Sequence, residues 1–128
     1  MKNKIDLGLQ AFLGFALLVF GLNKFIEFMA PPALPQPAID LFGALAASGY
    51  ILKMVALTEI ITGVLLLSRL YSALALILLA PLSVNIVLFH LILAPSLSAG
   101  APAYLLAGIN LYLLFQYLPK YKAILSAK

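Results

Sequence analysis

Four long apolar stretches run through this chain of 128 residues, and they constrain its fold more than any other feature. They cover residues 7–29, 51–68, 71–94 and 103–118, and charged side chains are rare within them. A bilayer core about 30 Å thick needs about 20 helical residues for each crossing. Lipid offers no hydrogen bonds to the backbone, so each stretch is predicted to be a transmembrane helix. The expected fold class is therefore all-α, an integral membrane antiparallel four-helix bundle.

The composition leaves little material for anything outside the bilayer. Hydrophobic residues make up 65% of the chain and charged residues 9%, a balance that a water-soluble domain of this length cannot bury. A single membrane domain over residues 1–128 is therefore expected. The net charge of +4 comes from basic residues that lie mostly at the two termini rather than in a basic patch with interleaved aromatics, so no nucleic-acid partner is expected. The absence of cysteine excludes disulfides, thiolate nucleophiles and cysteine-ligated metals.

The first connection is long and rich in proline. Its four prolines are Pro31, Pro32, Pro35 and Pro37. Proline lacks the amide donor and has a fixed φ, so the first helix is predicted to end before this segment. Residues 38–48 are too few to span a bilayer, while Ile39, Phe42 and Leu45 recur at helical spacing. A short helix lying in the membrane interface is predicted here.

Proline also marks the later helices. Pro81 lies in the middle of the third apolar stretch, where the loss of one backbone hydrogen bond is expected to kink the helix. Residues 95–102 are uncharged and include Pro95 and Pro102, so they are predicted to form a turn. Pro119 is predicted to stop the fourth crossing.

The basic residues predict the orientation of the chain. Six of them lie in the two termini and the middle connection: Lys2, Lys4, Arg69, Lys120, Lys122 and Lys128. An even number of crossings places these segments on one side, and the other two connections contain no Lys or Arg. By the positive-inside rule, both termini are expected to be cytoplasmic. The cytoplasmic half of the bundle is expected to be plain, with Gln10 and Gln116 close to helix ends and to water.

Polar side chains from all four predicted crossings gather in the opposite, outer half of the bilayer. These candidate ligand-binding residues are Asn23, Lys24, Glu27, Glu59, Asn85, His90 and Asn110. Ionisable groups within a span cost about 2.5–3.5 kcal/mol each on insertion scales, so their presence requires a reason. At about 1.5 Å per residue, Glu59 lies about 12 Å from the outer end of its helix, near mid-membrane. Its expected partner is Lys24, with Lys53 second.

Other interpretations of the same residues stay open. Lys24 and Glu27 lie about one helical turn apart, so they can pair as a simple interfacial anchor. A lone histidine such as His90 is more often a structural hydrogen-bonding group than a metal or haem ligand, and no metal site is expected. Asn85 and His90 lie about 140° apart on an ideal helix. A π-bulge near Pro81 would change which way they face.

Three short motifs complete the pattern: GLNKF at residues 21–25, EIITGVLLL at residues 59–67 and NIVLFH at residues 85–90. Together with the proline-rich connection, they resemble the DoxX family of small four-helix membrane proteins. The resemblance implies a multi-pass protein of the bacterial inner membrane. It also implies a link to redox chemistry, because some members of that family are associated with quinone-linked sulfur oxidation or with membrane assemblies that handle oxidative stress.

The sequence supports three hypotheses about function. In the first, the protein is a membrane subunit of a redox-linked system, and the outer-half residues bind a quinone-like molecule or contact an electron-transfer partner. In the second, it is a small proton-coupled transporter that uses Glu59, and four helices then imply a homo-oligomer. In the third, it is an assembly or scaffold protein whose polar residues only lock the helices together. None of the three assigns a catalytic residue.

Overall fold

The computed structural model describes residues 3–26, 34–93, 95 and 97–126. Every element in this part of the chain is a helix: α1 (Lys4–Ile26), α2 (Gln36–Ala47), α3 (Ile51–Ser68), α4 (Ser72–Leu88), the π-helical η1 (Phe89–Leu93), α5 (Leu97–Gln116) and α6 (Leu118–Leu125). The predicted all-α fold class is confirmed, and so is a short helix between the first two long ones.

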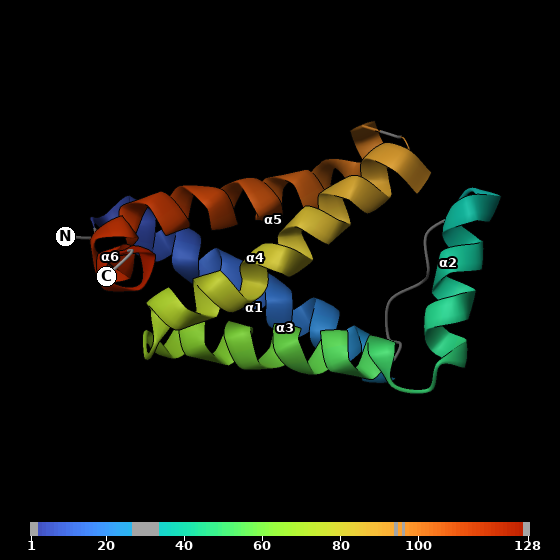
Figure 1. Ribbon diagram of the computed structural model, residues 1–128, viewed down its shortest axis with the longest axis horizontal. Coiled ribbons are helices and arrows are strands. Elements are labelled where there is room, and N and C mark those ends of the chain that lie inside the picture. The colour runs from blue at the N-terminus through green and yellow to red at the C-terminus, as the bar shows by residue number, and fades with distance from the viewer. Residues whose placement is uncertain (1–2, 27–33, 94, 96, 127–128) are drawn as a thin grey trace.

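The four long helices pack into a bundle that closes on itself (Figure 1). α1 packs on α3, α3 on α4 and α4 on α5, while α5 also contacts α1. Successive long helices run in opposite directions, as in other bundles with short connections. The start of α1, the α3–α4 turn and α6 lie together at what we call the terminal end of the bundle (Figure 1). α2 lies at the opposite end, which we call the α2 end.

In the part of the chain that the structure describes, three helical segments are long and apolar enough to cross a membrane, namely α1, α3 and α4 together with η1. α5 meets the same criterion only in combination with α6, from which it is bent by 73°. By helix length and composition, the chain is therefore a multi-pass membrane protein with three or four candidate spans. The assignment of four crossings, the kind of membrane and the side on which the termini lie stay predictions.

Glycines bring α1 and α3 into close contact. A Cβ atom at Gly63 would lie 2.8 Å from the carbonyl oxygen of Gly14, and a Cβ atom at Gly21 would lie 3.0 Å from that of Ala56. The first distance is too short for a side chain, and the second would force the backbone at Ala56 to shift, so glycine allows the two backbones to approach this far. Small residues are typical of helix contacts in membranes, where dispersion and hydrogen bonds drive association. This contact fixes how α1 and α3 face each other.

Two predictions about proline are wrong. Residues 97–102 do not form a turn, because α5 already begins at Leu97 and contains Pro102. A proline so close to a helix start removes at most one hydrogen bond from the helix. Pro119 does not stop the fourth helix, because α5 ends at Gln116 and Pro119 belongs to the first two positions of α6. At those positions the missing amide has no acceptor in the helix in any case.

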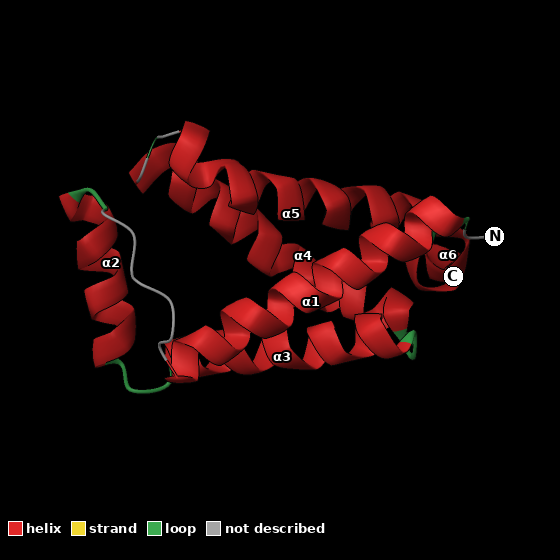
Figure 2. Cartoon of the chain, turned by 180° about the vertical axis from the view of Figure 1, so that it is seen from behind, coloured by secondary structure: helices red, strands yellow, loops and turns green. Residues whose placement is uncertain are grey.

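α2 stands apart from the bundle and runs across the direction of α1 and α3 (Figure 2). Pro35 is its N-cap, and Pro37 occupies one of its first two positions, where proline is well tolerated. The ring of Phe42 contacts the ring of Phe89 in η1, with 5.1 Å between the ring centroids. The two prolines thus mark the start of this short transverse helix, and the contact of Phe42 with Phe89 connects it to η1. Its position in the membrane interface stays a prediction.

Candidate functional site

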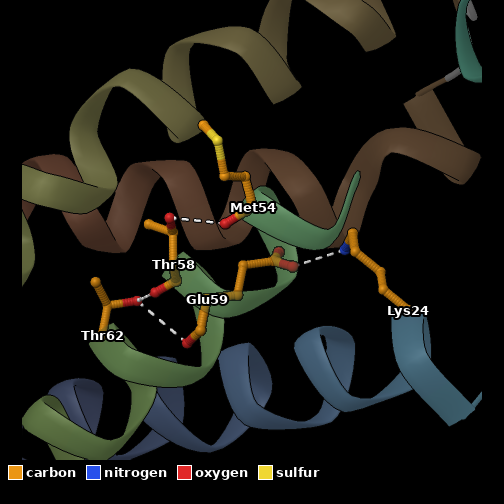
Figure 3. Close-up of polar contacts among 5 residues, drawn as sticks. All are labelled: Lys24, Met54, Thr58, Glu59 and Thr62. Carbon is orange, nitrogen blue, oxygen red and sulfur yellow. Dashed lines mark hydrogen bonds and ion pairs between the residues drawn. The ribbon is translucent and has the colours of Figure 1, made fainter. Parts of the chain in front are cut away.

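The predicted pair of Lys24 and Glu59 forms in the structure (Figure 3). Lys24 Nζ on α1 donates a hydrogen bond to Glu59 Oε1 on α3 over 2.7 Å. The glutamate side chain is 5% exposed, whereas the lysine side chain is 27% exposed. The carboxylate therefore lies inside the bundle, and the lysine connects it to the bundle surface. Lys24 is confirmed as the partner of Glu59, ahead of Lys53, which is exposed at the start of α3.

The surrounding residues place Glu59 opposite α1. A Cβ atom at Gly21 would lie 3.2 Å from Glu59 Cβ, so α1 passes directly over the glutamate. Lys24 is about one turn further along the same face of α1. On α3, the hydroxyl of Thr62 donates to the carbonyl oxygens of Thr58, at 2.7 Å, and Glu59, at 3.2 Å (Figure 3). This hydroxyl is satisfied within its own helix, and the charged pair links α1 to α3 at this level of the bundle.

Asn110 joins α5 to α4. Its Nδ2 atom donates to the carbonyl oxygen of Leu76 over 3.2 Å, and its Oδ1 atom accepts from the hydroxyl of Ser83 over 3.0 Å. The residue is buried, so both halves of its amide are used in helix packing. Its predicted contact with a ligand stays a prediction.

His90 lies in η1, and this π-helical segment beyond Pro81 changes the direction of the side chains that follow α4. Its Nδ1 atom lies 3.0 Å from the carbonyl oxygen of Ile86, and its ring meets the ring of Tyr104 on α5 with 6.1 Å between centroids. Asn85, on α4, is exposed on the surface of the bundle. The hydrogen bonds and ring contacts described for His90 and Asn110 thus lie on the α4–α5 side of the bundle.

Two further predicted site residues lie on or beyond α1. Asn23 is half-buried immediately before Lys24. Glu27 lies outside the described residues, and with it the alternative pairing of Lys24 with Glu27. Of the seven candidates, the structure brings Lys24 and Glu59 into direct contact across two helices.

A buried polar network at the terminal end was not predicted from the sequence. Gln10 is 1% exposed; its Nε2 atom donates to the Leu66 carbonyl oxygen over 3.0 Å and to Ser72 Oγ over 2.7 Å. Its Oε1 atom accepts from the hydroxyl of Tyr117 over 2.8 Å. The expectation that Gln10 lies close to water is therefore wrong, because the α3–α4 turn and the α5–α6 junction cover it.

Two more tyrosines, the exposed Tyr112 and the buried Tyr121, extend this polar region. Tyr112 donates to Asp6 Oδ1, and Tyr121 donates to the carbonyl oxygen of Ala73, each over 2.7 Å. Hydropathy alone gives no signal for such pairs, because their partners lie on helices far apart in the sequence.

Within the described part of the chain, no group of three His, Cys, Asp or Glu side chains is placed to hold a metal ion. No family model, curated protein or solved structure matches the chain. The structure therefore shows a small all-helical protein with three or four candidate membrane spans, and neither it nor the comparisons assign a family.

Proposed function

We propose that the protein is a membrane subunit of a redox-linked system, in which Lys24 and Glu59 bind the polar headgroup of a quinone-like molecule. The observation that carries this proposal is the 2.7 Å ion pair inside an apolar bundle, with its carboxylate buried and its ammonium partly exposed. The resemblance of three motifs to the DoxX family supports the same assignment. The proposal includes a location in the bacterial inner membrane, with both termini in the cytoplasm.

The chemistry of the pair suits a quinone headgroup. An ammonium group has three N–H donors, and Lys24 uses one of them for Glu59. Among the described residues, no further hydrogen bond uses the other donors, and a carbonyl oxygen that approaches from the lipid side can accept from them where the lysine is exposed. Hydrogen bonds from a charged donor are stronger than neutral ones, and a low dielectric strengthens them further. The carboxylate holds the ammonium in place, and a bound quinone would supply the redox chemistry in exchange with an electron-transfer partner.

The residues on α4 and η1 form a second part of this proposal. Asn85 offers an exposed amide, and His90 offers its second ring nitrogen, since Nδ1 faces the carbonyl oxygen of Ile86. Both groups can form hydrogen bonds with carbonyl or hydroxyl oxygens. Together with Asn23, they are predicted contacts for parts of the ligand that Lys24 does not reach.

The test is the recovery of quinone with the purified protein. Wild type, Lys24→Met and Lys53→Met are extracted in a mild detergent, and bound quinone is measured by mass spectrometry. Lys53 is the matched control because it is also a lysine near the α2 end and is exposed. We expect quinone in the wild type and the Lys53→Met variant, and at least about tenfold less in Lys24→Met. Absence of quinone from the wild type, or equal recovery in all three, would contradict the proposal.

A structural role is the second candidate function. The close approach of Gly21 to Ala56 and Glu59 favours it, because α1 and α3 are already closely packed where the ion pair adds a further link. An assembly or scaffold protein of this kind would lose thermal stability on substitution of Glu59 by Gln, without any change in a ligand signal. Proton uptake by proteoliposomes that depends on Glu59 would instead favour the transporter hypothesis.

A further inference from the structure

The terminal end of the bundle carries an open pocket with a volume of about 390 Å³. Its lining comes from three places: the α3–α4 turn, the first turn of α4 and the α5–α6 junction. Arg69 contributes a guanidinium group and Lys120 an ammonium group, whereas none of the lining residues is acidic. The pocket lies at the opposite end of the bundle from α2.

Neither Arg69 nor Lys120 has a carboxylate partner among the described residues of the chain. The one ion pair in that part of the structure is that of Lys24 and Glu59. Two positive charges that share a pocket repel each other unless an anion lies near them. Because the pocket is open to solvent, an anion from outside the chain can enter it. The charges of the pocket therefore favour an anionic ligand.

The buried network beneath the pocket supplies a further donor. The Leu66 carbonyl can only accept a hydrogen bond, so the amide group of Gln10 must be oriented with Nε2, its donor, toward Leu66. The same Nε2 atom also donates to Ser72 Oγ. The Ser72 hydroxyl, 6% exposed, thus accepts from Gln10 and keeps its own proton to donate. No hydrogen bond within the described residues uses that proton, and Ser72 lines the pocket.

The backbone of the α3–α4 turn adds amide donors to the same pocket. Ser72, Ala73 and Leu74 line it and form the first turn of α4, where amides have no acceptor within the helix. Tyr71, the N-cap, provides no side-chain hydrogen bond to them. Arg69 and Tyr71 also have positive φ angles of 62° and 56°, a conformation that is unfavourable for residues other than glycine. Arg69 is the C-cap of α3, and a left-handed residue is a common way to end a helix.

We propose that this pocket binds a phosphate group, with Arg69, Lys120 and the Ser72 hydroxyl as its donors. The two cations can only donate hydrogen bonds, the Ser72 hydroxyl still has its proton to donate, and the oxygens of a phosphate mono- or diester accept hydrogen bonds. The phosphate belongs either to the headgroup of an anionic phospholipid or to a soluble phosphate compound. Basic pockets between helices at the cytoplasmic surface are suited to anionic headgroups. This inference does not depend on the quinone proposal, because it concerns the other end of the bundle.

The experiment measures binding of two probes to the full chain in a zwitterionic detergent. Inorganic phosphate is titrated by calorimetry, and dioleoyl-phosphatidylglycerol is titrated by native mass spectrometry. The variants are Arg69→Gly, Lys120→Gln and, as the control, Lys122→Gln. Glycine adopts a positive φ without strain, so Arg69→Gly removes the cation and preserves the turn. Lys122 lies in the same helix as Lys120 but does not line the pocket. Lys122→Gln changes the net charge by the same amount as Lys120→Gln, so it tests for general charge attraction outside the pocket.

We expect Arg69→Gly and Lys120→Gln each to weaken binding at least about tenfold, as the loss of a charged hydrogen-bond donor implies. Lys122→Gln should stay within about twofold of the wild type. Binding of the phospholipid alone supports the proposal and identifies the headgroup as the source, whereas binding of inorganic phosphate, alone or as well, supports a site for the phosphate group itself. Failure of both probes to bind would overturn the proposal. So would a Lys122→Gln variant that weakens binding as much as Arg69→Gly and Lys120→Gln do, because this would indicate unspecific charge attraction.

Discussion

Gly63 on α3 lies against Gly14 on α1 so closely that a Cβ atom on Gly63 would be 2.8 Å from the Gly14 carbonyl oxygen. This backbone contact sets the rotation and distance of the two helices. The same pair of helices carries Lys24 and Glu59, so the glycine contact also determines that the two charged side chains meet. The candidate site therefore depends on residues that have no polar side chain.

Substitution of Gly63 by alanine should destabilise the bundle by about 1–3 kcal/mol, the usual cost of overpacking a close contact. The new methyl group would meet backbone, which cannot move aside as a side chain can. Gly8 and Gly108 provide matched controls, because a Cβ atom at either meets no atom within 4 Å. Thermal unfolding in detergent, followed by circular dichroism, is the measurement. A Gly63→Ala variant as stable as Gly8→Ala would show that the helices are further apart.

Removal of Lys24 alone should be more harmful than removal of both charges. Lys24→Met leaves the carboxylate of Glu59 inside the bundle, and loss of one partner of a buried pair costs about 3–5 kcal/mol. We expect the lower end of that range, because the lysine is partly exposed. The double variant Lys24→Met/Glu59→Gln should recover part of the loss. Unfolding free energies of the two single variants and the double variant provide the check, and strictly additive losses would contradict a direct interaction.

Gln10 should contribute more to stability than its place near a helix end suggests. Gln10→Leu removes three hydrogen bonds, and at about 0.6–1.7 kcal/mol for each bond in a membrane protein the loss is about 2–5 kcal/mol. Tyr117→Phe removes one of the three and should cost less. Asn85→Leu is the control, since Asn85 is exposed on the bundle surface. Equal melting temperatures for Gln10→Leu and Asn85→Leu would rule out the network.

Asn110→Leu should separate helix packing from ligand binding. The variant loses the hydrogen bonds to Leu76 and Ser83, and leaving buried groups unsatisfied costs about 1–3 kcal/mol. If helix packing is the only role of this amide, whose two halves are both bonded to α4, the recovery of quinone stays at the wild-type level, whereas the predicted ligand contact requires a loss of quinone. Mass spectrometry and thermal unfolding of the same preparation test both points. Loss of quinone from a variant that stays folded would place Asn110 in the ligand site.

Part of the candidate site was predictable from the sequence alone. Glu59 is an acid deep in an apolar segment, and few basic residues lie within reach of it, so helix length and depth are enough to indicate Lys24 as its partner. The buried network of Gln10, Ser72 and Tyr117 was not predictable in the same way. Its members lie on helices far apart in the sequence, and no spacing along one helix indicates that they meet. The pocket between Arg69 and Lys120 follows from the same long-range packing.

The sequence by itself determined the all-α fold, the apolar helices and the short helix after the prolines. These features depend on hydropathy and on missing amide donors, which are local properties of the chain. Only the tertiary structure decided that Pro102 and Pro119 lie inside helices, that Gln10 is buried and that Arg69 shares a pocket with Lys120. Helix rotation and bending decide these points, and both are set by side-chain packing between helices rather than by the composition of any one of them.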